Sequence, residues 1–257
     1  MITAGIDVGA KNVKVIILKD DDVLGKSRGL MEMDRKKSVR DAFEICLAES
    51  GVKEKDIEYI VSTGAGSKTI DFAQKDSTMV TCDATGIAKL KPSVRTVIDI
   101  GANEARAIRC DETGKVSDFA VNEKCAAGSG AFVEAMARAM EVSLDEFVDL
   151  SMKAEKTIPI NAQCAIFAES EVVSLVHEET ARPDICRSVH DAMAQRIASM
   201  ARRVRVEKDV AVVGGVALNK GMLDSLKREL KTDFVTVDDP EYVGALGAAV
   251  LAARVAK

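Results

Sequence analysis

Two segments of the chain share one pattern of hydrophobic and polar positions. Residues 6–10 predict an apolar strand that ends in an Asp-x-Gly turn, and an alternating apolar run follows at 13–16. The same pattern returns 92 residues later, at 98–102 and 105–108. Two apolar runs joined by a short glycine-containing loop are typical of a β-hairpin. Because the offset is longer than the period of solenoid repeats, we expect two duplicated domains.

The remaining sequence alternates between strand-like and helix-like patterns, which predicts α/β lobes. We place an N-terminal lobe at 1–91 and a C-terminal lobe at 92–257, with a terminal helix at 240–255 that can pack back on the first lobe. The other expected strands are at about 23–28, 115–121, 210–213 and 234–237, and the other expected helices are at 39–50, 126–140, 143–153, 165–178, 184–204 and 218–230.

Composition narrows the class of protein. Of the 257 residues, 47% are hydrophobic and 30% are charged, which is enough apolar material for a sizeable core. The net charge of −5 argues against a nucleic-acid partner. No apolar stretch reaches the length of a membrane span, and the N-terminus has no basic leader, so we expect a cytoplasmic protein without a membrane partner. In that compartment the six cysteines are expected to be free thiols or metal ligands.

The two Asp-x-Gly turns have the residues that a phosphate-binding loop needs. Glycine lets the backbone approach a phosphate closely and present N–H groups to it. An aspartate at the strand end, Asp7 or Asp99, can hold Mg²⁺ through the waters that this ion keeps. Two unrelated tight hairpins are the alternative, because Asp and Gly are common in turns. The candidate nucleotide-binding positions of these loops are Gly9, Ala10, Lys11, Asn12, Gly101 and Ala102.

A third candidate follows the expected strand at 210–213. Gly214 and Gly215 lead through Val216 into a predicted helix, with Asn219 near its start. This arrangement places bare backbone and a helix N-terminus at the end of a strand, where nucleotides bind in α/β proteins. All four residues are therefore candidates for nucleotide binding. The alternative is a plain strand-to-helix turn in which Asn219 serves as the cap.

Two of the cysteines, Cys125 and Cys164, stand at the start of predicted helices. The free N–H groups and partial positive charge of a helix start lower the pKa of a thiol and stabilise a bound anion. A cubane iron–sulfur cluster is such an anion, and because it needs four thiolates, two chains would have to pool theirs. A cysteine can also be a small buried hydrophobe. We expect that second role for Cys46, Cys82, Cys110 and Cys186.

The glycine motifs resemble those of a known superfamily. Segments 6–9, 98–101 and 214–217 resemble the phosphate 1, phosphate 2 and adenosine motifs of the actin, hexokinase and Hsp70 superfamily. The resemblance covers essentially the whole chain. It implies two RNase-H-like lobes, the actin-like ATPase fold, with ATP and Mg²⁺ in the cleft between the lobes.

The segments around the two cysteines resemble a narrower group. Segments 124–130 and 164–172 are similar to those of the BadF/BadG/BcrA/BcrD-type ATPases, which include activators of 2-hydroxyacyl-CoA dehydratases and ATPase subunits of benzoyl-CoA reductase. This resemblance implies that Cys125 and Cys164 ligate one [4Fe–4S] cluster shared by two subunits. It also implies a loop near the phosphates, for which a flexible helix start is the alternative. That loop consists of Gly128, Ser129 and Gly130.

The residues after the second Asp-x-Gly turn distinguish the members of this group. Dehydratase activators carry a Gly-Gln-Asp-like stretch there, whereas this chain has Ala102-Asn103-Glu104, which is closer to a benzoyl-CoA reductase ATPase subunit. Asn103 or Glu104 would orient the attacking water, beside the catalytic role expected for Asp7 and Asp99. The alternatives are a degenerate pair in a less active subunit and a plain surface turn at Asn103 and Glu104.

The resemblance thus implies an ATP-hydrolysing electron-transfer protein that works without oxygen. A ferredoxin or flavodoxin would donate the electron, and an acyl-CoA-binding catalytic subunit would receive it. A second ATPase subunit, identical or homologous, would lie across the cluster. The leading expectation is a benzoyl-CoA reductase ATPase subunit, and the alternative is a homodimeric dehydratase activator. Rivals of other classes are a regulator that merely binds ATP and a sugar kinase of the same fold, with Asp83 as its candidate base.

Overall fold

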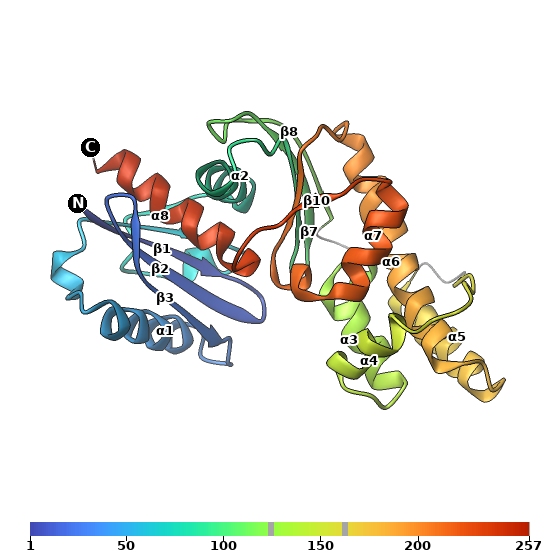
Figure 1. Ribbon diagram of the computed structural model, residues 1–257. Helices are drawn as coiled ribbons and strands as arrows, with labels where there is room; N and C mark the ends of the chain where they lie inside the picture. The colour runs from blue at the N-terminus through green and yellow to red at the C-terminus, as the bar shows by residue number, and fades with distance from the viewer. Residues whose placement is uncertain (123–125, 161–163, 257) are drawn as a thin grey trace. The chain divides into compact units, whose positions relative to one another are not determined.

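The computed structural model describes residues 1–122, 126–160 and 164–256 (Figure 1). By its internal contacts the chain forms two compact units, each made of segments that are not continuous in sequence. The first contains Met1–Val97, Ile108–Asp118 and Val237–Lys257, and the second contains Ile98–Ala107 and Phe119–Thr236. Residues 92–97 and two later segments therefore belong by contact to the first unit. The expected lobe boundary after residue 91 stays a prediction.

The first unit is built on a five-stranded mixed sheet in the order β3-β2-β1-β4-β5. Strands β1, β2 and β3 form an antiparallel meander, while β4 pairs in parallel with β1 and β5 in parallel with β4. The meander confirms the first predicted hairpin and its third strand. The strands are β1 (Ile2–Val8), β2 (Asn12–Lys19), β3 (Asp22–Leu30), β4 (Tyr59–Thr63) and β5 (Lys75–Asp76).

Helices cover both faces of this sheet. On β2, Val15 and Ile17 pack in the cluster that contains α1, whereas Ile16 and Leu18 pack in the cluster that contains α8. This division follows from the two-residue period of a strand, and Figure 1 shows α1 and α8 on opposite sides of the sheet. The helical elements of this unit are α1 (Arg35–Ser50), α2 (Met79–Leu90), α8 (Val243–Val255) and the 3₁₀ turns η1 (Glu54–Asp56), η2 (Ser67–Thr69) and η5 (Pro240–Tyr242).

The terminal helix α8 lies very close to β1 and α2 because glycines line the contact. A Cβ added to Gly5 on β1 would overlap the carbonyl oxygen of Ala245, and one added to Gly247 on α8 would overlap that of Cys82. Close-packed interiors leave no room for such atoms. The end of the chain is therefore held within the first unit by backbone-to-backbone packing.

The second sheet repeats the strand order of the first, as β8-β7-β6-β9-β10. Strands β9 and β10 pair in parallel, as β4 and β5 do. The duplication predicted from two short motifs is thus confirmed for whole sheets, and so is the α/β fold class. The strands are β6 (Thr96–Ile100), β7 (Ala105–Cys110), β8 (Val116–Asn122), β9 (Val210–Val213) and β10 (Phe234–Val235).

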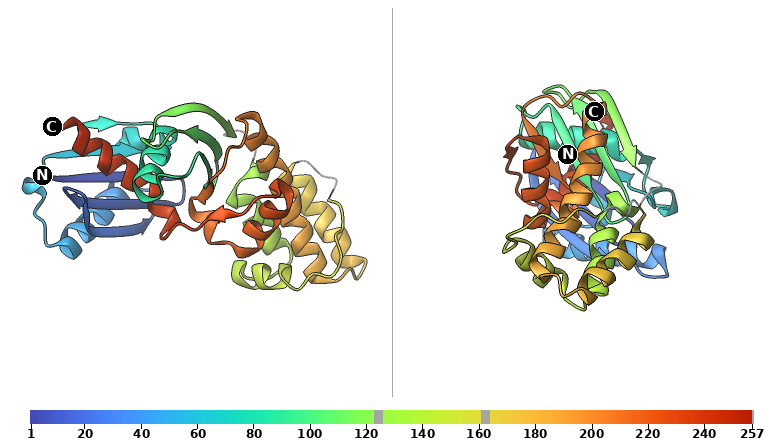
Figure 2. Two further views of the ribbon diagram at one scale, coloured as in Figure 1. Left: turned by 45° about the horizontal axis from the view of Figure 1, so that its top comes forward. Right: turned by 90° about the vertical axis from the view of Figure 1, so that its right-hand side faces the viewer.

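A layer of helices completes the core of the second unit. Phe132 and Met136 of α3, Phe147 of α4 and Val189 of α6 are buried in one cluster with Ile98 of β6. Helix α6 has 22 residues and packs against α4 and α7 (Figure 2). None of the described helices has both the length and the apolarity of a membrane span. The helical elements are η3 (Ala126–Gly128), α3 (Gly130–Ala139), α4 (Leu144–Ser151), α5 (Ala165–His177), α6 (Arg182–Arg203), η4 (Gly215–Leu218) and α7 (Lys220–Leu230).

Some local predictions are wrong in detail, among them the terminal helix expected at 240–255, which begins at Val243 after the 3₁₀ turn η5. The segment 126–140 is not one helix, because the 3₁₀ turn η3 ends at Gly128 and α3 begins after Ser129. The helix expected from residue 218 begins at Lys220, because the side chain of Asn219 caps it. The strand expected at 234–237 ends at Val235.

Candidate functional site

The first hairpin loop places a buried carboxylate beside a lysine. Asp7 lies near the end of β1 and is 3% exposed, and its Oδ2 accepts a 2.9 Å hydrogen bond from Nζ of Lys14, directly opposite on β2. The N–H of Gly9 closes the loop by donating to the carbonyl of Asn12 at 3.0 Å. Between Gly9 and Asn12 lies the exposed tip of the loop. Its residues are Ala10 and Lys11.

The second hairpin repeats this arrangement. Asp99 is also 3% exposed, and its Oδ2 accepts a 2.6 Å hydrogen bond from Nη1 of Arg106. The N–H of Gly101 donates to the carbonyl of Glu104 at 2.8 Å. Each aspartate thus pairs with a cation seven residues further on, so the duplication extends to a buried ion pair. The cation offsets the cost of removing the carboxylate from water.

The two candidate water-orienting residues lie in different environments. The carboxylate of Glu104 accepts a hydrogen bond from Nη2 of Arg106, the guanidinium that also binds Asp99. Asn103 lies exposed at the tip of the loop. The arrangement therefore leaves Asn103 more accessible to a ligand than Glu104.

Three of the candidate glycine segments meet within the second unit. The N–H of Gly130 donates to the carbonyl of Gly101 at 2.9 Å, and that of Ala131 donates to Ala102 at 2.8 Å. A Cβ added to Gly130 would lie 3.0 Å from Cγ2 of Val216. The loop at Gly128, Ser129 and Gly130 is thus hydrogen-bonded to the second hairpin loop and packed on the turn after β9. Ser129 itself is fully buried.

The turn after β9 requires glycine at its first position. Gly214 has φ of +85°, a region that favours glycine, and a Cβ there would overlap Oδ1 of Asp99. At Gly215, by contrast, no described atom lies within 4 Å of the place where a Cβ would stand. The backbone at Gly215 is therefore open to a ligand on that side.

The amide of Asn219 is engaged at both ends. Its Oδ1 accepts the N–H of Met222 at 2.9 Å, which is the cap of α7, so that Nδ2 faces Nε2 of His190 at 3.1 Å. His190 is fully buried, and its Nδ1 has no hydrogen-bond partner among the described residues. These contacts match the alternative in which Asn219 serves as a helix cap.

The first unit contains a counterpart of the Gly214 turn that was not predicted from the sequence. Gly64 follows β4 with φ of +90°, and a Cβ there would lie 2.6 Å from Oδ1 of Asp7. This is the relation that Gly214 has to Asp99. The available signal was the short strand-like segment 59–63, rich in aromatic and β-branched residues, followed directly by Gly-Ala-Gly.

The described cysteines fall into two environments. Cys46, Cys82, Cys110 and Cys186 are buried. Burial raises the pKa of the Cys46 and Cys110 thiols to about 11 and of the Cys82 and Cys186 thiols to about 12. Such thiols stay protonated at neutral pH, as expected for small buried hydrophobes.

Cys164 is the exception among the described cysteines. It is exposed and is the N-cap residue of α5, as its predicted place at a helix start requires. In the first turn of this helix, Ile166 and Phe167 are 73% and 69% exposed. The expected partner of Cys164, Cys125, lies outside the described residues. Within the described part of the chain, no three His, Cys, Asp or Glu side chains come together as a metal site.

The candidate base of a sugar kinase lies in a different setting. Asp83 is 1% exposed on α2, where a Cβ added to Gly244 of α8 would lie 3.1 Å from its Oδ1. A carboxylate packed between two helices is not accessible to a sugar hydroxyl. This environment disfavours the kinase alternative.

The duplicated mixed sheets with glycine turns at their strand ends define the class of this protein as an actin-like ATPase fold. A solved structure of this kind is the activator of the 2-hydroxyisocaproyl-CoA dehydratase from Clostridium difficile with bound ADPNP. It matches with a TM-score of 0.93 and 34% identity, covering 100% of this chain and 96% of that chain.

The sequence pattern of the BadF/BadG/BcrA/BcrD ATPase family matches residues 4–252, and the chain belongs to this family. It is 41% identical over 261 residues to the activator of lactoyl-CoA dehydratase from Anaerotignum propionicum, covering 100% of this chain and 99% of the relative. It is 34% identical over 260 residues to a benzoyl-CoA reductase subunit from Thauera aromatica, covering 97% of this chain and 92% of the relative.

Proposed function

We propose that this chain is the ATP-hydrolysing activator of a 2-hydroxyacyl-CoA dehydratase and delivers electrons to that acyl-CoA-binding enzyme. The relatives support this choice, because identity is 41% to an activator and 34% to a benzoyl-CoA reductase subunit. The residues Ala102-Asn103-Glu104 had favoured a benzoyl-CoA reductase subunit over a dehydratase activator, and the relatives reverse that order. The reductase subunit becomes the alternative.

The observation that carries the proposal is the environment of Cys164. A thiolate is a metal ligand only where its charge is stabilised, and a helix start does this through free N–H groups. Cys164 is exposed at such a start, whereas the other described cysteines are buried. It is thus the described thiol best suited to an external ligand.

We propose that two copies of the chain pool Cys125 and Cys164 around one [4Fe–4S] cluster, because one chain offers only these two candidate thiols and a cubane needs four. When bound, the cluster supplies a one-electron carrier, which a ferredoxin or flavodoxin would reduce. Ile166 and Phe167 near Cys164 support a subunit contact there, since exposed apolar residues that cluster mark interaction surfaces.

For the nucleotide, we propose that the hairpin loops and the turn at Gly214 and Gly215 bind the phosphates and the adenosine. The bound ADPNP of the Clostridium difficile relative supports this. Asp7 and Asp99 would hold Mg²⁺ through water, because each carboxylate is already paired with a cation that disfavours direct contact with the metal. Asn103 would orient the attacking water.

The test is anaerobic purification followed by iron and sulfide analysis, size-exclusion chromatography and an ATPase assay. We expect a homodimer with about four iron atoms per dimer. The Cys164→Ser variant should lose the iron and keep ADPNP binding. The matched control is Cys110→Ser, at a buried thiol, which should keep both. A dimer without iron, or a Cys164→Ser form that retains it, would contradict the proposal.

The alternatives give different results in the same preparation. A reductase subunit would need a second, non-identical ATPase chain before it bound iron. A sugar kinase would bind no iron and would consume ATP in proportion to added hexose. A regulator that merely binds ATP would show neither iron nor turnover.

A further inference from the structure

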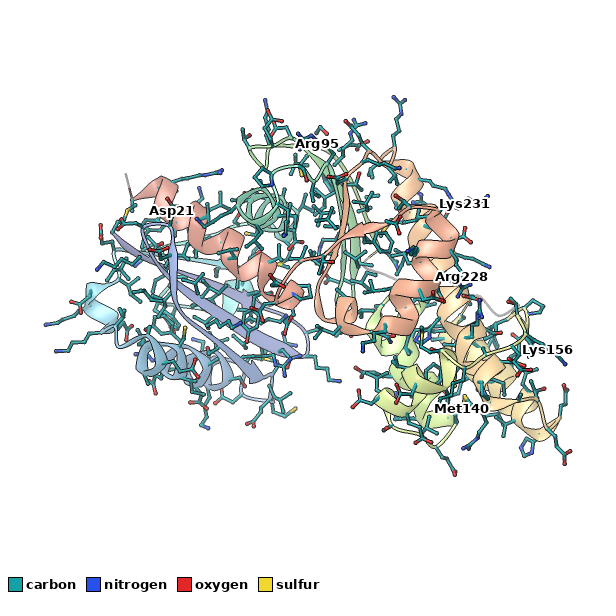
Figure 3. All side chains as sticks on the ribbon, in the orientation of Figure 1. Asp21, Arg95, Met140, Lys156, Arg228 and Lys231 are labelled. Carbon is teal, nitrogen blue, oxygen red and sulfur yellow. The ribbon has the colours of Figure 1, made fainter. Side chains whose placement is uncertain are left out.

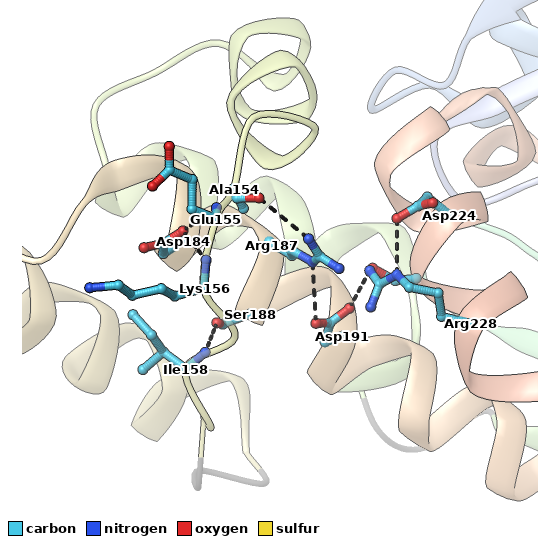
Figure 4. A network of polar contacts seen from close by, with 11 residues as sticks. Ala154, Glu155, Lys156, Ile158, Asp184, Arg187, Ser188, Asp191, Asp224 and Arg228 are labelled. Carbon is cyan, nitrogen blue, oxygen red and sulfur yellow. Dashed lines mark hydrogen bonds and ion pairs between the residues drawn. The ribbon is translucent and has the colours of Figure 1, made fainter.

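The segment that leads toward Cys164 is held by side chains of α6. Residues 154–160 form no helix or strand, so their backbone N–H groups need other acceptors. Oδ1 of Asp184 accepts the N–H groups of Glu155 and Lys156, both at 2.9 Å. Oγ of Ser188 accepts the N–H of Ile158 at 3.0 Å. Figure 4 shows these bonds side by side.

We call the hydrogen bonds of Asp184 and Ser188 to residues 155–158 the clamp. They fix which residues of the segment lie beside which turn of α6. Asp184 and Ser188 are one helical turn apart on α6, about 6 Å along the axis. Residues 155 and 156 meet Asp184 and residue 158 meets Ser188, so the segment runs along α6 in the same direction. Both side chains are buried, at 6% and 1% exposure, which limits the access of water to their acceptor oxygens. Cys164 follows only six positions after Ile158.

The same helix is linked to α7, which follows the glycine turn at 214–215. Two contacts make this link. Asn219, the cap of α7, contacts His190 at 3.1 Å, and Arg228 of α7 pairs with Asp191 of α6 at 2.9 Å. Figure 3 labels Arg228 on α7 and Lys156 in the clamped segment.

Arg187 joins the two sets of contacts. Its Nη1 donates to the carbonyl of Ala154 at 3.4 Å, and its Nε lies 3.9 Å from Oδ2 of Asp191 (Figure 4). Helix α6 therefore carries a row of polar side chains, Asp184, Arg187, Ser188 and Asp191, which we call the ladder. One end binds the segment before Cys164, and the other binds the helix that begins after the candidate nucleotide turn.

We propose that Asp184 and Ser188 are positioning residues for Cys164, and that the ladder through Asp191 and Arg228 transmits nucleotide occupancy to that thiol. The inference rests on the proposed function in one respect, because it takes the turn at 214–215 as part of the nucleotide site. A ligand that shifts this turn moves the cap of α7. Since α7 is tied to α6 by an ion pair, the clamped segment moves with it.

The test measures the alkylation rate of Cys164 in iron-free protein, with and without ADPNP and Mg²⁺. The modified peptide is quantified by mass spectrometry, and nucleotide binding is measured separately by equilibrium dialysis. In the unsubstituted protein, ADPNP should change the alkylation rate of Cys164 by at least about fivefold, which corresponds to a coupling near 1 kcal/mol. Because the protein contains no iron in this assay, the result does not depend on whether the chain binds a cluster.

The clamp is tested by Asp184→Ala, which leaves the backbone N–H groups of Glu155 and Lys156 without their acceptor. We expect the alkylation rate of the exposed Cys164 thiol to change about tenfold with or without nucleotide, because the hydrogen bonds that fix the segment before it are lost, and one such bond to a carboxylate commonly shifts a local equilibrium by that factor. Asp184→Asn keeps an acceptor oxygen and should restore the rate of the unsubstituted protein, which shows that hydrogen bonding and not charge is required. Asp149→Ala, at an exposed residue of α4, is the matched control. Ser188→Ala repeats the test should Asp184→Ala not fold.

The ladder is tested by Arg228→Gln, which removes the ion pair to Asp191. We expect this variant to bind ADPNP as before but to lose the nucleotide effect on Cys164. Unchanged reactivity in folded Asp184→Ala or Ser188→Ala would overturn the positioning role. A full nucleotide effect in Arg228→Gln, or none in unsubstituted protein that binds ADPNP, would overturn the transmission. Failure of the unsubstituted protein to bind ADPNP would instead defeat the proposed function together with the transmission, and the positioning role would still be decided by Asp184→Ala.

Discussion

Protonation of His190 should make the second unit sensitive to mild acid. Burial lowers the pKa of this histidine to about 4. The contact with Asn219 requires a neutral ring, because Nδ2 of the amide donates to Nε2. A protonated ring would present a donor to a donor and would bury an unpaired charge.

The size of the effect follows from the two pKa values. The unfolded chain binds the proton near pH 6.5 and the folded chain only near pH 4, so folding becomes less favourable as the pH falls through this window. Between pH 7 and pH 5 the free energy of unfolding should drop by about 2 kcal/mol on account of this one group. Below about pH 4 both states are protonated, and the loss stops growing.

The assay is urea unfolding at pH 7, 6 and 5, followed by far-UV circular dichroism because the chain has no tryptophan. His190→Gln keeps an acceptor for Asn219 but cannot titrate, so it should lack this part of the pH dependence. His177→Gln, at the exposed end of α5, is the matched control and should behave as the unsubstituted protein does. If His190→Gln and the unsubstituted protein lose stability in parallel between pH 7 and pH 5, the reasoning is refuted.

Three further predictions concern packing, the buried ion pair and turnover. Gly247→Val should lower the free energy of unfolding by about 1–3 kcal/mol, because the new side chain would overlap the carbonyl of Cys82, and urea unfolding measures this. Arg106→Gln should lower it by about 3–5 kcal/mol by leaving Asp99 buried without its cation, in the same assay. Asn103→Ala should reduce the kcat of ATP hydrolysis about tenfold to hundredfold while ADPNP affinity, measured by dialysis, stays unchanged. An equal loss of affinity would show that Asn103 binds the nucleotide and does not orient water.

Much of the fold and part of the candidate site could be predicted from patterns among residues that are close in sequence. The two hairpins were predictable because an apolar strand, an Asp-x-Gly turn and a second strand lie within about ten residues of each other. Repetition of that pattern at Asp7 and Asp99 then implied duplicated sheets, which the equal strand orders confirm. The place of Cys164 at a helix start was predictable for the same reason, since a cap and its helix are neighbours in sequence.

Contacts between distant segments were decided only by the tertiary structure. The relation of Gly64 to Asp7 exists because β4 pairs with β1 across more than fifty residues of sequence, and no periodic pattern records such pairing. The sequence alone would also allow Asn219 to face a ligand. The packing of α6 decides otherwise, because it places His190 against the amide of Asn219. Likewise, the residues before Cys164 have no regular pattern of their own. Their backbone is satisfied by Asp184 on a helix almost thirty residues away, and a hydrogen bond of that kind depends on how helix and segment meet in space.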